Sequence, residues 1–115
     1  MNDVIAIVER IKHEPLDWIE LAELTDHPNQ SVRGTAIQFL ASRFGGEERC
    51  VKLLEKLARD DVNHTRVMGT ITLAQMCVKL LEGIGTDSAK NAVKSLISTW
   101  PEKDRADLEW FRQNG

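Results

Sequence analysis

The chain has 115 residues, of which 42% are hydrophobic and 29% are charged, and its net charge is −3. This length suits one domain with one core, and a mixed-sign, mildly acidic surface argues against an extended phosphate-binding face, which needs clustered Lys and Arg. No stretch approaches the roughly 18 to 20 apolar residues of a membrane span, and the short apolar run at the N-terminus lacks a basic start, so we expect a cytoplasmic, soluble protein without membrane contact.

Apolar residues recur at spacings of three and four along the whole chain, and Pro, Gly and Asn mark the breaks. Strand-like alternation is absent, so the pattern predicts an all-α fold of about seven helices. The predicted helices span, in chain order, about residues 2–12, 15–24, 30–44, 47–59, 64–82, 88–99 and 102–113. Pro15 suits the first turn of the second helix, and the fifth helix, beginning near His64, is the longest.

A leucine followed nine residues later by an arginine occurs three times in this series. The pairs are Leu24/Arg33, Leu57/Arg66 and Leu96/Arg105. The offset is 33 residues from position 24 to 57, and 39 from position 57 to 96. A period in this range is typical of helical repeats in which each helix pair covers its neighbour's apolar face. We therefore expect a single domain, 1–115, made of a capping helix (1–14), two repeats (15–45 and 46–83) and a degenerate third repeat (87–114).

The turn segments that carry this period share a local pattern, an Asp followed by a Val-Arg pair and a small residue three positions on. The first copy has Asp26, Val32, Arg33 and Ala36, and the second keeps Asp60 or Asp61, Arg66 and Gly69, with Thr65 in place of valine. This pattern resembles HEAT-type repeats, particularly the short variety of phycobilin-lyase-like proteins. The resemblance covers residues 15–82 and implies a right-handed superhelical solenoid whose second helices line a concave face. Proteins of this type mostly bind other proteins, and a minority assist chromophore attachment or bind nucleic acid. The resemblance implies no catalytic residue.

The repeated arginines, Arg33, Arg66 and Arg105, have two interpretations. They are either a ladder that binds an anion, or structural side chains that pair with the turn residues Asp26 and Asp60 or cap backbone carbonyls. We favour the structural interpretation, because these positions match the arginine of the family that the chain resembles.

On the opposite face of the same helices we predict a ridge that binds a partner. Its positions follow from adding the repeat offset to positions on the third helix. Its residues are Thr35, Gln38, Met68, Ile71, Gln75, Asp107 and Trp110. One interpretation is that the fifth helix is buried all round as the middle of a small domain. The other is an exposed patch that binds a partner protein or a second copy of the chain, for which methionine and tryptophan are suited.

Other chemistry is less well supported by the spacing of residues. His13, His27 and His64 lack the three- or four-residue spacing of a helical metal site, so we expect neither metal nor cofactor. Cys50 and Cys77 are expected to be buried free thiols in a reducing compartment.

A basic row on the fourth helix has no interleaved aromatic residues, which favours a solvated face over nucleic-acid binding. The row consists of Arg49, Lys52, Lys56 and Arg59.

These observations favour a non-enzymatic protein-interaction module of the adaptor, inhibitor or immunity type. A second hypothesis is an accessory subunit of an enzyme or chromophore-lyase-like complex, in which a partner chain supplies the chemistry. Binding to a nucleic-acid backbone through the fourth helix is a third.

Overall fold

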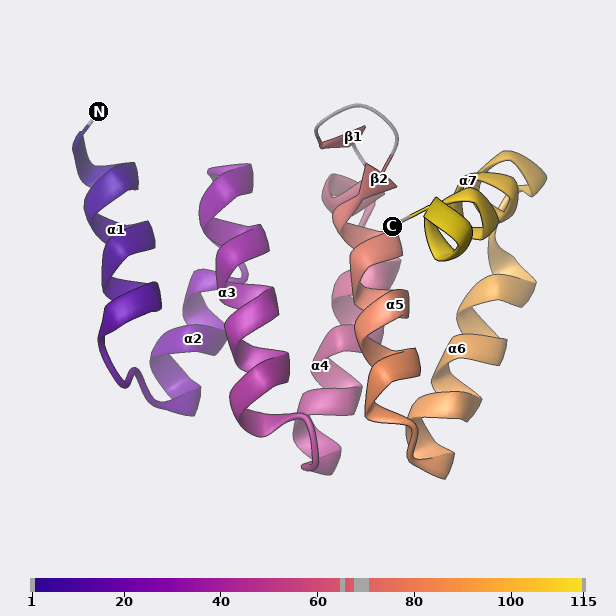
Figure 1. Cartoon of the computed structure of the whole chain (residues 1–115), viewed down its shortest axis with the longest axis horizontal. Coiled ribbons are helices and arrows are strands. Elements are labelled where there is room, and N and C mark those ends of the chain that lie inside the picture. The colour runs from indigo at the N-terminus through magenta and orange to yellow at the C-terminus, as the bar shows by residue number, and fades with distance from the viewer. Residues whose placement is uncertain (1, 65, 68–70, 115) are drawn as a thin grey trace. The chain divides into compact units, whose positions relative to one another are not determined.

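A computed structural model of the chain describes residues 2–64, 66–67 and 71–114, and Figure 1 shows that they are almost entirely helical. The all-α prediction is confirmed. The described helices are α1 (Asn2–His13), α2 (Trp18–Leu24), α3 (Gln30–Phe44), α4 (Glu48–Arg59), the 3₁₀ helix η1 (Asp61–His64), α5 (Leu73–Ile84), α6 (Asp87–Thr99) and α7 (Glu102–Asn114). A short antiparallel pair of strands, β1 (Arg66–Val67) and β2 (Ile71–Thr72), precedes α5.

The second helix begins later than Pro15, the predicted start. Residues before Trp18 are outside α2, because Asp17 forms the N-cap: its Oδ1 accepts a hydrogen bond from the backbone N–H of Glu20 at 2.9 Å. The start of α3 follows the same rule, since the Asn29 side chain accepts from the backbone N–H groups of Ser31 and Val32. Short polar side chains therefore set both boundaries.

The predicted helix 64–82 is wrong in its first part. The chain continues from η1 through the β1–β2 pair, in which Arg66 lies opposite Thr72 and Val67 opposite Ile71, and α5 begins only at Leu73. The cause is a capping box: the Thr72 side chain accepts from the backbone N–H of Gln75 at 3.1 Å, and the Gln75 side chain accepts from the backbone N–H of Thr72 at 2.8 Å. This reciprocal pair of bonds satisfies two donors that a helix start otherwise leaves unpaired.

The segment after α4 is held in its turn by side chains that bond to the last carbonyls of that helix. Asn63, which is almost completely buried, donates from Nδ2 to the carbonyl of Leu57 at 3.0 Å. The His64 ring lies 2.8 Å from the carbonyl of Ala58 and packs edge-on against Trp100. The last carbonyls of a helix need partners from outside it, and these two side chains supply them at the end of α4.

The residues group into two compact units, a first unit of Met1–Cys50 and a second unit of Val51–Gly115. In the first unit, α3 packs against both α1 and α2. Its core consists of apolar side chains with no exposed surface from all three helices, including Ile11, Leu21, Ile37 and Leu40. Full burial of side chains of this size contributes about 1.5–3 kcal/mol each, which makes this packing the main source of the unit's stability.

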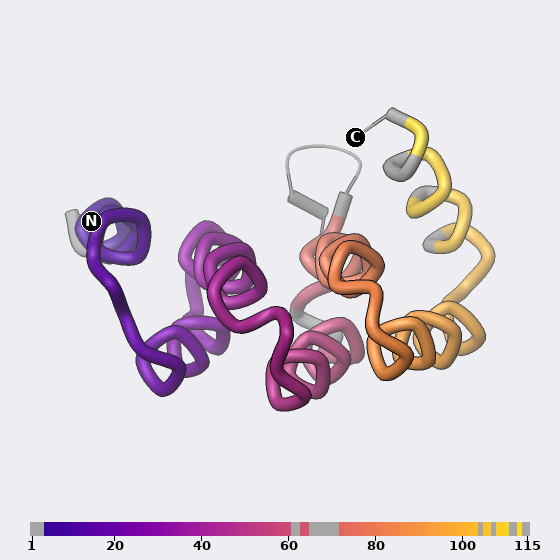
Figure 2. The backbone as a smooth tube through the Cα atoms, turned by 60° about the horizontal axis from the view of Figure 1, so that its bottom comes forward, coloured from indigo at the N-terminus to yellow at the C-terminus, as the bar shows by residue number. Residues whose placement is uncertain are grey.

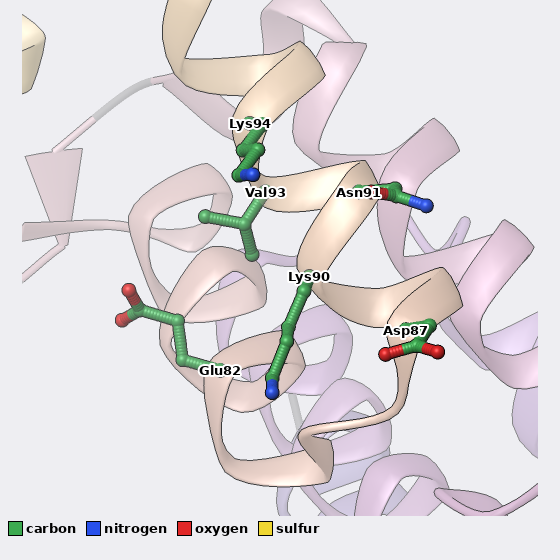
Figure 3. A pocket seen from close by; sticks show the side chains of 6 residues that line it. All are labelled: Glu82, Asp87, Lys90, Asn91, Val93 and Lys94. Atoms are coloured by element: carbon green, nitrogen blue, oxygen red, sulfur yellow. The ribbon is translucent and has the colours of Figure 1, made fainter.

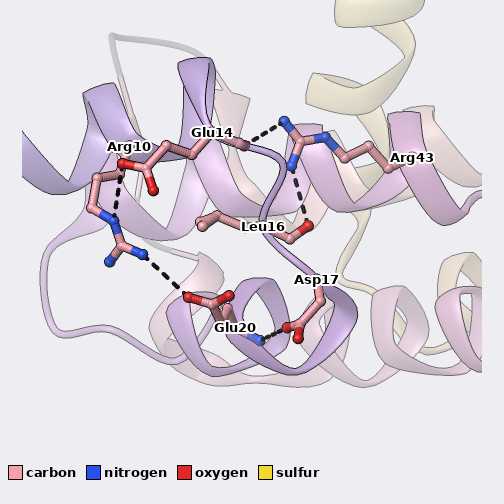
Figure 4. A network of polar contacts seen from close by, with 6 residues as sticks. All are labelled: Arg10, Glu14, Leu16, Asp17, Glu20 and Arg43. Atoms are coloured by element: carbon pink, nitrogen blue, oxygen red, sulfur yellow. Dashed lines mark hydrogen bonds and ion pairs between the residues drawn. The ribbon is translucent and has the colours of Figure 1, made fainter.

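The polar contacts of the first unit fix the turn between α1 and α2 (Figure 4). Arg43, near the end of α3, donates from Nη2 to the carbonyls of Ile11 and Glu14 and from Nη1 to that of Leu16. On the outer side, Arg10 forms ion pairs with Glu14 at 3.4 Å and with Glu20 of α2 at 3.2 Å. The guanidinium of Arg43 thus binds carbonyls at and after the end of α1 and connects this turn to α3.

In the second unit, α5 packs against α6 and η1 and has fewer contacts with α7. Figure 2 shows α5 and α6 lying side by side. The core is again leucine-rich, with Leu54, Leu73, Leu81, Leu96 and Leu108 almost completely buried. Gly85 ends α5 at a φ of 71°, a left-handed conformation that glycine adopts without strain. Within the described ranges, no helix is long and apolar enough to cross a membrane.

Candidate partner-binding surfaces

The predicted ridge draws its residues from both compact units. Thr35 and Gln38 lie on α3 in the first unit, and the remaining positions lie in the second unit. Ile71 lies on β2 and not on a helix, so the helical register that carried Gln38 to Ile71 does not apply. Met68 lies outside the described residues, as do the side chains of Ile71 and Asp107.

The burial of Gln75 contradicts its assignment to the ridge. It is 1% exposed, and its side chain is part of the capping box that begins α5. A side chain buried in this way holds its own helix together and presents no surface to a partner. The correction follows from the capping box, because a helix beginning at Leu73 places Gln75 in the first turn, facing inward.

The α3 positions have the surface character that the ridge requires. Gln38 is exposed, and Thr35 is half-buried, with its hydroxyl donating to the carbonyl of Ser31 at 2.8 Å. The Gln38 side chain carries an amide, which can both donate and accept hydrogen bonds. Their role in partner binding stays a prediction.

Trp110 on α7 is the largest exposed apolar side chain of the described residues, with 51% of its surface accessible. Leu108 of the same helix is almost completely buried, while Glu109 and Gln113 are exposed. The helix is therefore anchored through Leu108 and presents Trp110 among polar neighbours. An indole in this position combines a large apolar area with one hydrogen-bond donor.

The three repeated arginines differ in their surroundings. Arg33 is 5% exposed, and its Nη1 donates to the carbonyls of His27 at 3.0 Å and Pro28 at 2.9 Å. This is the carbonyl-capping arrangement of the structural interpretation, and both carbonyls belong to the turn before α3. The Arg66 side chain lies outside the described residues, and Arg105 is exposed.

The turn aspartates differ from one another as well. Asp26 is exposed, whereas Asp60 is half-buried and its backbone carbonyl accepts from the N–H of Asn63 at 3.0 Å. Asp60 thus contributes to the turn after α4 through its backbone, which no pattern of side chains predicts.

A cleft of about 600 Å³ in the second unit was not anticipated from the sequence (Figure 3). The last turn of α5 and the first turns of α6 form it, and it is lined by Glu82, Asp87, Lys90, Asn91, Val93 and Lys94. The i, i+4 spacing of Lys90 and Lys94 on one helix face is readable in the sequence. The hollow itself depends on how α5 and α6 pack, so spacing alone could not reveal it.

The basic row of α4 is partly occupied by contacts within the protein. Arg49 stacks over the ring of Trp18, with 4.4 Å between guanidinium carbon and ring centroid, and pairs with Glu47 at 2.7 Å. Arg59 pairs with Glu55 and donates to the hydroxyl of Ser95 on α6. Lys52 and Lys56 are exposed.

The histidines make local structural contacts. The Nδ1 of His27 accepts from the backbone N–H of Asn29 at 3.0 Å, and His13 lies 3.0 Å from Glu9 on α1. In the part of the chain that the structure describes, no group of three or more His, Cys, Asp or Glu residues is placed to hold a metal ion.

Both cysteines are buried and form no disulfide, as expected. Burial, the largest cause, and the neighbouring Glu47 raise the pKa of the Cys50 thiol to about 11, while Arg49 opposes this rise. A thiol that holds its proton this firmly is a poor nucleophile.

No known protein family, curated protein or solved structure matches this chain.

Proposed function

We propose that this chain is a non-enzymatic protein-interaction module whose helix pairs stack in a HEAT-like, right-handed superhelix. The succession of helices and the Leu/Arg recurrence support this arrangement. In it, α3, α5 and α7 would line a concave face, and the module would act as an adaptor or inhibitor by covering part of a partner protein.

The observation that carries the proposal is the half-exposed indole of Trp110 on α7. Burying an aromatic side chain of this size at an interface removes a large apolar area from water, and tryptophan is enriched among the residues that dominate binding energies. Truncation of such a residue costs about 2 kcal/mol or more, which corresponds to a loss of affinity of about 30-fold.

The test compares two variants of the full chain as baits in a native lysate. Trp110→Ser removes the proposed anchor, and Ile5→Ser is the matched control, since Ile5 is 67% exposed on α1 in the first unit. We expect a partner that binds the wild-type chain and Ile5→Ser equally but binds Trp110→Ser about 30-fold more weakly, as measured with the purified partner. Circular dichroism verifies that both variants are folded.

A second copy of the chain is one partner that this test identifies directly. Sedimentation of the pure protein between about 1 and 100 µM would then show a dimer that Trp110→Ser dissociates. If Trp110→Ser retains every interaction of the wild-type chain, in the lysate and in sedimentation, the proposal is wrong.

A further inference from the structure

The cleft between α5 and α6 has the size and the kind of lining that suit a small ligand. Its volume of about 600 Å³ lies within the range of small-molecule sites. Val93 is 8% exposed and provides an apolar base, while the other lining side chains are polar or charged. A concave site with an apolar base and several converging polar groups is the usual architecture for binding a ligand.

Two of the side chains that line this cleft carry an ammonium group, and both come from α6. Lys90 and Lys94 are one helical turn apart on α6, both are exposed, and neither forms an ion pair with any residue that the structure describes. Two like charges at i and i+4 repel each other. An anion placed between them relieves this repulsion, which gives the cleft a preference for a negatively charged group.

The acidic residues of the cleft limit how much negative charge the ligand can carry. In Figure 3 the Lys90 side chain lies between those of Glu82 and Asp87. The described lining residues include two lysines and two carboxylates and so have a formal charge of zero, and a dianionic phosphate meets repulsion that a single carboxylate largely avoids. Among the described residues, the lining also holds no arginine, whose planar fork is the usual bidentate ligand of phosphate.

We propose that this cleft binds a carboxylate carried on a short aliphatic chain. The carboxylate lies between Lys90 and Lys94, the aliphatic part covers Val93, and the Asn91 amide binds a polar group beside it. A free carboxylic acid and an acidic side chain of another protein share this chemistry. The site is separate from Trp110 and does not depend on the function proposed for α7.

The test is a titration of the full-length, isotope-labelled protein followed by amide chemical shifts. The first probe is hexanoate, and the second is a blocked peptide whose only ionised group is a glutamate side chain. Hexan-1-ol, which has a similar tail without the charge, is the control ligand. We expect saturable shifts at Asn91, Val93 and their neighbours, with a Kd of about 1–10 mM for a ligand of this size.

The chain offers a matched control for the lysine pair. Lys52 and Lys56 are also exposed and also lie at i and i+4, but on α4 and outside the cleft. The double variant Lys90→Gln/Lys94→Gln should weaken binding at least 10-fold, whereas Lys52→Gln/Lys56→Gln, with the same change in net charge, should leave it within twofold. Trp110→Ser should leave it unchanged.

Binding of hexanoate supports a small carboxylic acid as the ligand, and binding of the peptide alone supports an acidic protein segment. The proposal is overturned if neither probe gives saturable shifts up to about 50 mM, or if hexan-1-ol binds as well as hexanoate. Equal losses in the two double variants also overturn it, because they indicate a general charge effect and no site.

Discussion

The position at which α5 starts can be tested by whether a single substitution, Thr72→Ala, lowers or raises the free energy of unfolding. Thr72 is 5% exposed and forms the N-cap: its Oγ1 accepts from the backbone N–H of Gln75 at 3.1 Å. Removing an N-cap hydroxyl costs about 1 kcal/mol, within a range of roughly 0.5–2. If a continuous helix instead ran from His64, as the apolar periodicity predicts, Thr72 would be an interior residue. The same substitution would then stabilise the helix by about 0.5 kcal/mol, because alanine has the higher helix propensity.

Urea unfolding followed by far-UV circular dichroism measures this difference. With an m value of about 1.5 kcal/mol/M, loss of the cap lowers the midpoint by about 0.7 M, whereas the interior case raises it. Two other threonines supply internal standards. Thr86 is the N-cap of α6, so Thr86→Ala should also lower the midpoint. Thr35 lies inside α3 and its hydroxyl bonds back to the Ser31 carbonyl, so Thr35→Ala should raise it slightly.

The reasoning fails if Thr72→Ala behaves like Thr35→Ala and raises the midpoint. A loss matching that of Thr86→Ala assigns Thr72 to a helix start. Because the three substitutions remove the same atoms, differences among them report position in the helix rather than the chemistry of the side chain.

Two further substitutions test the structural arginine and the buried thiol. Arg33→Met should destabilise the chain by about 2 kcal/mol in thermal unfolding, since it deprives two turn carbonyls of a charged donor. Arg105→Met, at an exposed position, should change the free energy of unfolding by no more than about 0.5 kcal/mol. If Arg33→Met has an equally small effect, the structural role of Arg33 is refuted. For Cys50, folding raises the pKa from 9.0 to about 11, so the unfolded chain loses the proton first and the free energy of unfolding should fall as the pH rises from 9 to 11. Urea midpoints of Cys50→Ala should fall less over this range, and parallel curves for the two proteins would contradict the assignment.

Periodicity and capping residues make most of the helices predictable from the sequence. Apolar spacing located α1, α3, α4, α6 and α7 because each has a side that must be buried, and Asn29 begins α3 as an N-cap, as its type suggests. The same spacing failed at residues 66–67 and 71–72, which form β1 and β2 although the apolar pattern continues through them. There the capping pair Thr72 and Gln75 was a readable signal, and it outweighs the continuity of the apolar pattern.

The candidate surfaces were less predictable, because they depend on packing between elements. A helical wheel places Gln75 on an outer face, but a residue's face can be assigned only once the helix start is known. The cleft beside Lys90 and Lys94 arises from the packing of α5 against α6, and no spacing within one helix encodes a hollow between two. Trp110 was included in the ridge by carrying the repeat offset to the seventh predicted helix, and the structure shows it 51% exposed.

The two buried thiols allow the cooperativity of unfolding to be measured, because one lies in each compact unit. Cys50 lies in the first unit, where its thiol points to the carbonyl of Leu40, and Cys77 is fully buried within α5 in the second. Each becomes accessible to an alkylating reagent only when its own unit opens. Labelling kinetics resolved by peptide mass therefore separate the opening of the two units: equal rates indicate that the chain unfolds as one body, and unequal rates give the stability of each unit on its own.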